Sequence, residues 1–147
     1  MSREYIQKTV ESLIQKHQTR DPAEIAKALD IGIKYADIGS LKGLYTVVLD
    51  NRFIVVNQNL SAPQQRAVLA HELGHDRLHR HFIDNILQET MLYDMTSQPE
   101  YEANLFAAEL LIDCAQAEQM AKDGATAEEI AINFAVENEL IEILFRK

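Results

Sequence analysis

The string His71-Glu72-Leu73-Gly74-His75 constrains this 147-residue chain more than any other feature. Residues four apart on an α-helix lie one turn above each other on the same face, about 6 Å apart along the axis. Both imidazoles can therefore reach one ion, and Glu72 then lies beside that ion without binding it. This pattern is typical of zinc hydrolases, in which the glutamate is the general base for a zinc-bound water. The alternative is that His71 and His75 are ordinary, partly buried residues.

The flanking residues predict that the string lies in the middle of a helix. Ser61 is the expected N-cap, Pro63 falls in the first turn, and Gln64 completes a capping box. An apolar stripe follows, formed by Val68, Leu69, Leu73 and Leu78. Gly74 inside a helix costs roughly 1 kcal/mol relative to Ala, a cost often accepted where another element approaches closely. We expect a strand or a ligand to lie against it.

Catalytic zinc normally takes three protein ligands, and two later histidines fit the third position poorly. His81 stands ten residues after His71, as the third histidine of metzincins does, but that pattern needs Gly where this chain has Leu78. His79 lies about 12 Å along the helix axis from His71, too far for both to reach one tetrahedral ion. Structural or solvent-facing roles therefore suit His79 and His81 better.

Residues 100–111 predict a second helix, whose small residues would allow close packing on the first. Glu100 and Asn104 share one face, so Glu100 can bind zinc while Asn104 accepts a hydrogen bond from a ligating imidazole. Glu102 lies roughly 160° away around the helix, so only one of the two glutamates should be a ligand. We favour Glu100, with Glu102 as the alternative and Glu109 as a more distant choice.

Glu100 also has a purely structural alternative. The run Ser97-Gln98-Pro99-Glu100 fits a capping box, in which the Glu100 side chain hydrogen-bonds back to the N-cap backbone.

The string 71–75, followed by Glu-x-Glu-Ala-Asn-x-Phe-Ala-Ala-Glu-Leu-Leu at 100–111, resembles the ImmA/IrrE family of metallopeptidases, found on bacterial mobile elements, prophages and chromosomes. Residues 21–36 are similar to the family's opening helix and strand, and residues 54–57 resemble its strand before the zinc helix. Asp113-Cys114 stands where the family often has Pro, which leaves the end of the second helix open.

This resemblance implies one compact, zincin-like α+β domain over residues 1–147, mostly helical, with a small β-sheet packed on the zinc helix. It implies Zn²⁺ bound by His71, His75 and a glutamate of the second helix, with Glu72 catalytic. Family members typically cleave, or otherwise inactivate, a helix-turn-helix repressor and so switch on a phage, another mobile element or a stress response. We therefore expect a zinc endopeptidase; the alternative is a non-catalytic, zinc-containing anti-repressor that acts by binding its regulator.

Composition agrees with such a protein. The chain has 23 acidic and 14 basic residues and a formal charge of −9, which argues against direct binding of nucleic acid and favours a basic partner. It has no run of 18 apolar residues and no signal-peptide pattern, so we expect a cytoplasmic protein without a membrane segment. The single cysteine, Cys114, fits a small buried hydrophobe better than a nucleophile.

The remaining segments give coarser expectations. Helices are expected at 3–18 and 22–29, strands at 31–36, 43–49 and 52–57, a two-residue hairpin turn at Asp50-Asn51, and a loop or short helix over 82–98. The inward face of the first helix should comprise Tyr5, Ile6, Val10, Leu13 and Ile14. The helical pair near the C-terminus suits packing or partner docking better than DNA recognition. Candidate donors to an oxyanion are Tyr93, Arg77, His79 and His81.

Overall fold

The computed structural model describes residues 1–80, 88–90 and 97–146, and their fold is of the expected α+β class. The helices are α1 (Arg3–His17), α2 (Pro22–Ala28), α3 (Ala62–His79), α4 (Gln98–Leu111), α5 (Cys114–Lys122), α6 (Ala127–Phe134) and α7 (Asn138–Phe145). The strands are β1 (Gly32–Ala36), β2 (Gly43–Val48), β3 (Asn51–Asn57) and β4 (Gln88–Thr90). The strand β4 lies where a loop or short helix was expected.

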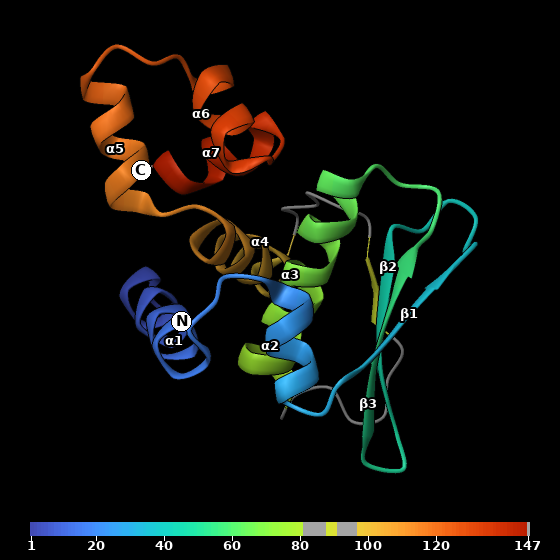
Figure 1. The fold of residues 1–147 in the computed structure, drawn as a ribbon. Coiled ribbons are helices and arrows are strands. Elements are labelled where there is room, and N and C mark those ends of the chain that lie inside the picture. The colour runs from blue at the N-terminus through green and yellow to red at the C-terminus, as the bar shows by residue number, and fades with distance from the viewer. Residues whose placement is uncertain (81–87, 91–96, 147) are drawn as a thin grey trace.

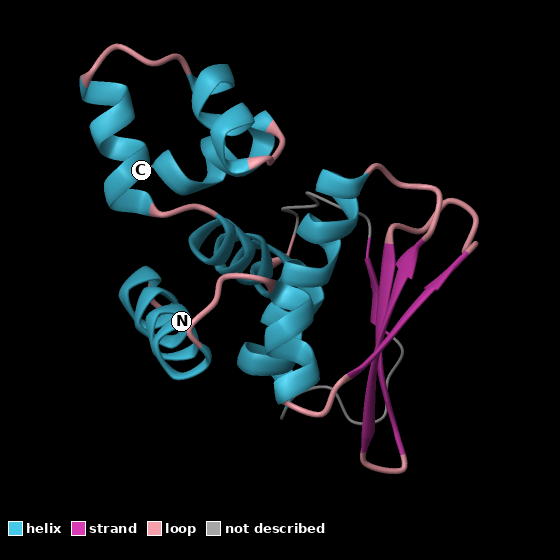
Figure 2. Cartoon of the chain, viewed as in Figure 1, coloured by secondary structure: helices cyan, strands magenta, loops and turns pink. Residues whose placement is uncertain are grey.

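The strands form one mixed sheet in the order β1-β3-β2-β4. β1 runs parallel to β3, whereas β2 is antiparallel to both β3 and β4. The sheet stands on one side of the helices, with β1 and β4 at its edges (Figure 2). Its strands therefore cover one flank of α3 and leave the other flank to helices.

The hairpin turn between β2 and β3 lies one residue earlier than expected. Asn51 pairs with Val48 and already belongs to β3, so the turn consists of Leu49 and Asp50. Both have positive φ, at 50° and 66°, as a type I′ turn requires. The Asn51 side chain donates to the Leu49 carbonyl at 3.1 Å, which gives this asparagine a role beside the turn.

Helix α3 lies between the sheet and α4 (Figure 1). Its expected capping box is present, because Ser61 Oγ accepts from the Gln64 amide and the Gln64 side chain accepts from the Ser61 amide. The element against Gly74 is a helix, where a strand or a ligand was expected. A Cβ at Gly74 would lie 3.1 Å from three atoms of Phe106 on α4, so the glycine allows two helices to approach closely.

Helix α1 packs on α4 through a narrower apolar face than expected. Ile6, Val10 and Leu13 are buried and Ile14 is partly buried, but Tyr5 is 55% exposed. Tyr5 precedes Ile6 by one residue, which is about 100° around the helix, so a stripe centred on Ile6 and Val10 leaves it on the solvent side.

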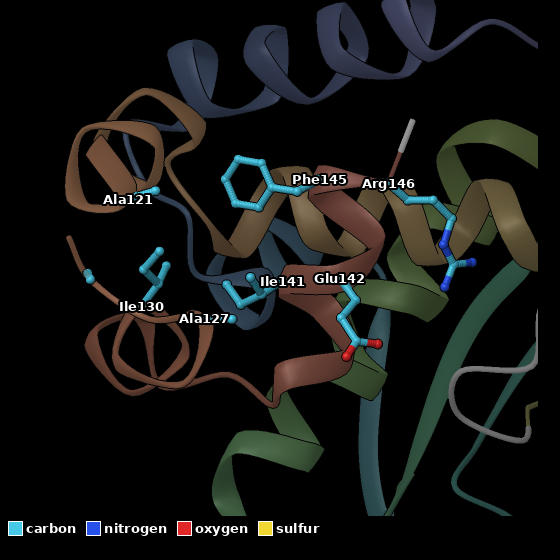
Figure 3. A pocket seen from close by; sticks show the side chains of 8 residues that line it. Ala121, Ala127, Ile130, Ile141, Glu142, Phe145 and Arg146 are labelled. Atoms are coloured by element: carbon cyan, nitrogen blue, oxygen red, sulfur yellow. The ribbon is translucent and has the colours of Figure 1, made fainter. Parts of the chain in front are cut away.

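The end of α4, which the sequence left open, is set at Ile112 and Asp113. α4 ends at Leu111, Ile112 is extended, and Asp113 caps α5 by accepting from the Gln116 amide at 3.1 Å. Thr126 and Glu129 then form the capping box that begins α6. Helices α5, α6 and α7 surround an open, largely apolar pocket of about 530 Å³, with Ala121, Ile130 and Phe145 pointing towards it from the three helices (Figure 3).

Within residues 1–80, 88–90 and 97–146, no helix combines the length and the hydropathy that crossing a membrane requires.

A buried carboxylate ties α3 to the sheet. Asp76 accepts hydrogen bonds from the Tyr45 hydroxyl on β2, from Arg52 on β3 at 2.9 and 3.1 Å, and from its neighbour Arg77 at 2.7 and 3.0 Å. Arg52 also donates to the Leu29 carbonyl, at the end of α2. Burial, together with the hydrogen bond to Asp76, raises the pKa of Tyr45 above its ordinary value. Asp76 thus joins α3 to β2 and β3, and Arg52 extends the connection to the end of α2.

Asp76→Ala should destabilise the fold strongly, because it leaves the mostly buried Arg52 guanidinium without its counter-ion. We expect a loss of about 3–5 kcal/mol in the free energy of unfolding, measured by urea denaturation of the metal-free protein. Asp123→Ala, at an exposed carboxylate, is the control and should change stability by less than about 0.5 kcal/mol. Equal effects of the two substitutions would contradict the prediction.

Candidate metal centre

Three buried side chains from α3 and α4 converge on one point. His71 Nε2 lies 3.0 Å from Glu100 Oε2, and His75 Nε2 lies 2.9 Å from Glu100 Oε1. One potential ligand atom from each residue lies within 4.8 Å of those of the other two. The helix spacing places the imidazoles one turn apart, and the start of α4 places the carboxylate across from both. The structure therefore brings together the favoured set of three.

The second nitrogen of each ring already has a partner. His71 Nδ1 lies 2.8 Å from Asn104 Oδ1, and His75 Nδ1 lies 3.0 Å from His79 Nδ1. An amide oxygen can only accept, so the His71 ring donates from Nδ1, and Nε2 is the nitrogen that faces the cluster. Asn104 thus has the contact that a partner of a ligating imidazole needs.

The donor set fits a tetrahedral metal ion with one position left open. Two imidazole nitrogens and one carboxylate oxygen are ligands that zinc accepts, and in a tetrahedral zinc site neighbouring ligand atoms stand about 3.3 Å apart. The distances from Glu100 to the two rings are only a few tenths of an ångström shorter. These two contacts use different Glu100 oxygens, and the three ligand atoms lie within 4.8 Å of one another, so side chains would have to shift to surround an ion.

Electrostatics favour the metal-binding forms of Glu100 and His75, and the protonated form of His71. Burial lowers the pKa of His75 to about 4, although the hydrogen bond to Glu100 opposes this. Burial also acts to lower the pKa of His71, but Glu100 and the charge of Glu72 outweigh it and raise that pKa. Burial acts to raise the pKa of Glu100, and hydrogen bonds from both rings reverse this and lower it. Near neutral pH Glu100 is a carboxylate and His75 is neutral, the forms that bind metal ions.

The structural alternative for Glu100 is only half present. Ser97 Oγ accepts from the Glu100 amide at 3.3 Å, as an N-cap should. The Glu100 carboxylate, however, lies at the two imidazoles rather than at the backbone of Ser97. Capping and the cluster therefore use different atoms of one residue.

The other two glutamates of α4 lie outside the cluster. Glu102 Oε1 lies 2.9 Å from His79 Nε2, and Glu102 Oε2 accepts from Gln98 at 3.2 Å. Glu109 meets Gln7 at 3.1 Å, far along the helix. The rotation of about 160° between Glu100 and Glu102 explains why they face different partners.

Glu72 is buried next to the cluster, under the start of β2. A Cβ on Gly43 would lie 3.4 Å from Glu72 Oε1 and only 2.5 Å from Val68 Cγ1. Strand β2 can therefore cross α3 beside the Glu72 carboxylate only where the chain has no side chain. The sequence predicts Gly43 only as the first residue of a strand. No sequence pattern indicates that it lies beside Glu72.

The candidate oxyanion donors have other partners or lie outside the described residues. Arg77 donates to Asp76 at 2.7 and 3.0 Å. His79 is 5% exposed and lies between His75 and Glu102, so its role is structural rather than solvent-facing. His81 and Tyr93 fall outside the described residues.

Two histidines one turn apart on a helix, an adjacent glutamate, and a carboxylate from a second helix form a candidate metal site of the kind that metallopeptidases use. The chain matches the family described as IrrE N-terminal-like domain, a peptidase family, over residues 26–143. It is 32% identical to uncharacterized immunity region protein 2 of Bacillus phage phi105 over 139 residues, which cover 94% of this chain and 87% of the phage protein.

The chain is also 33% identical to the metallopeptidase ImmA of Bacillus subtilis strain 168 over 109 residues, covering 73% of this chain and 63% of ImmA. It therefore belongs to the ImmA/IrrE family of metallopeptidases, as the sequence resemblance predicts.

Metal titration distinguishes the two candidate glutamates. With saturating metal, elemental analysis should find about one equivalent in the wild type, and His71→Ala or Glu100→Ala should abolish that site because each removes one of three ligands. Glu102→Ala should still reach one equivalent under the same conditions. Loss of the site in Glu102→Ala and its survival in Glu100→Ala would reverse the assignment.

Gly43→Ala should destabilise the protein by about 1–3 kcal/mol, because the new methyl group overlaps Val68 in a close-packed contact. Urea denaturation of Gly43→Ala, Val68→Ala and the double variant tests the cause. Val68→Ala alone leaves a cavity, and Gly43→Ala should partly fill it, so the double variant should lose less stability than the sum of the two. Additive losses would rule out this contact as the reason for the glycine.

Proposed function

We propose that this protein is a zinc-dependent endopeptidase that cleaves, and so inactivates, a helix-turn-helix repressor. The observation that supports this most directly is the buried cluster of His71, His75 and Glu100, with the Glu72 carboxylate beside it. The metallopeptidase family of the chain supports the same chemistry.

His71, His75 and Glu100 would hold the metal, and Glu72 would carry the proton in the reaction. Zinc bound there would supply a Lewis acid able to polarise the scissile carbonyl and to lower the pKa of a water towards 7. Glu72 accepts the proton of the attacking water and later passes it to the leaving amine, so that the peptide bond breaks with one water consumed. Burial under β2 keeps the Glu72 carboxylate away from bulk water, which strengthens its interactions.

The proposed substrate is a cytoplasmic repressor of a phage or another mobile element. The name of the phage phi105 relative places that protein in an immunity region, which supports a phage setting for the proposed substrate. A DNA-binding protein carries basic surface, and the formal charge of −9 on this chain favours its approach. Because the partner acts on DNA, the proposed site of action is the cytoplasm.

Glu72→Gln should retain zinc and lose cleavage by at least about 100-fold, because an amide cannot accept the proton of the attacking water. The test co-expresses tagged helix-turn-helix regulators of the source genome with the wild type or the variant, followed by immunoblotting for fragments. Elemental analysis of the purified variant checks that the metal remains.

The same experiment separates cleavage from inactivation by binding. A regulator cleaved by the wild type and intact with Glu72→Gln supports the endopeptidase. A regulator that stays intact but releases its operator equally with both proteins supports the anti-repressor alternative. If every regulator stays intact and bound to DNA in the presence of the zinc-loaded wild type, both proposals fail.

A further inference from the structure

We infer that His79 and Glu102 form a relay that orients His75 for metal binding, which makes both of them positioning residues. The inference rests on the metal site of the proposed function, but not on peptidase activity. It assigns a task to the second glutamate of the Glu-x-Glu pair and to the third histidine of α3.

When His75 binds a metal, only one placement of the hydrogens on the ring nitrogens of His75 and His79 is compatible with this relay. His75 Nε2 faces the cluster, 2.9 Å from Glu100, and must be bare to bind an ion. Its Nδ1 therefore carries the hydrogen and donates to His79 Nδ1, 3.0 Å away. His79 must accept at Nδ1, so its own hydrogen sits on Nε2, which donates to Glu102 Oε1 at 2.9 Å.

The Glu102 carboxylate at the end of the relay fixes the direction in which the hydrogen bonds are donated, from His75 to His79 to Glu102. An ionised carboxylate can only accept, so it selects the His79 tautomer whose Nδ1 is free to receive the hydrogen of His75. Glu102 is held in turn by Gln98, which donates to its second oxygen at 3.2 Å. His75, His79 and Glu102 are 1%, 5% and 4% exposed, so bulk water does not compete with these contacts.

The two imidazoles of the cluster are thus supported differently. His71 donates directly to the neutral amide oxygen of Asn104 at 2.8 Å, whereas His75 is connected through a second ring to a charged group. A carboxylate behind a ligating histidine raises its basicity as well as fixing its orientation. The relay also joins α3 to α4 on the opposite side of His75 from Glu100.

The first test is Zn²⁺ affinity, measured by competition with a chromophoric chelator. His79→Ala and Glu102→Ala should each weaken binding about 10- to 100-fold, the usual effect of removing such a partner. The double variant should be no weaker than the worse single variant, because both substitutions break one relay. Glu102→Gln should weaken binding less than Glu102→Ala, since its amide oxygen still accepts from His79 although the charge is lost.

Glu109→Ala is the matched control, because Glu109 is a buried carboxylate of the same helix that lies outside the relay. Its Zn²⁺ affinity should equal that of the wild type. Urea denaturation of the metal-free variants shows whether any loss of affinity merely follows a loss of stability. Wild-type affinity in both His79→Ala and Glu102→Ala would overturn the relay and leave the proposed function standing.

The second test needs no substitution. Long-range ¹H–¹⁵N spectra of the zinc-loaded wild type, labelled with ¹⁵N-histidine, report which ring nitrogen carries each hydrogen. We expect hydrogen on Nδ1 of His75 and on Nε2 of His79, and hydrogen on Nδ1 of His79 would overturn the inference. A wild type that binds no zinc at all overturns both this inference and the proposed function. A zinc-loaded wild type with hydrogen on Nδ1 of His79 overturns only this inference, so the two kinds of failure are distinguishable.

Discussion

Gly74 has no side chain, and Phe106 of α4 fills the space against it. This contact sets how closely α4 approaches α3, and the residues at the start of α4 depend on that approach. Glu100 reaches both His71 and His75 at about hydrogen-bond distance because the two helices lie this close. A larger side chain at position 74 would move α4 away, and the carboxylate of the cluster with it. The glycine costs some helix stability and in return makes the cluster possible.

Several carboxylates are buried in the described part of the chain, and three of them have basic or hydrogen-bonding partners described above. Asp76 has two arginines and a tyrosine, Glu100 has two imidazoles, and Glu102 has His79 and Gln98. An unpaired buried charge costs on the order of several kcal/mol, so these partners offset a cost that the buried carboxylates of α3 and α4 would otherwise carry. The same pairs hold the rings of α3 in single orientations, which is what a metal site needs.

Local patterns predicted much of the fold and the composition of the cluster. The capping box of Ser61 and Gln64 began α3 where expected, and helix periodicity alone separated Glu100 from Glu102 by face. Both succeed because helix geometry relates residues within one turn of each other. The errors were of another kind. Tyr5 faces solvent, the hairpin turn lies one residue early, and Gly74 meets a helix, because each depends on which surface the rest of the chain presents.

The sequence by itself determined that His71 and His75 stand one turn apart on α3, with Glu72 between them in the chain. It also determined that Glu100 and Glu102 lie on different faces of α4. Only the tertiary structure decided which side chains meet. Glu102 is connected to His75 through His79. Gly43 lies beside Glu72, and Asp76 pairs with Arg52. The reason is that contacts between elements depend on the rotation of each helix about its axis and on where it crosses its neighbour. Those quantities follow from the packing of the whole core, which no local pattern encodes.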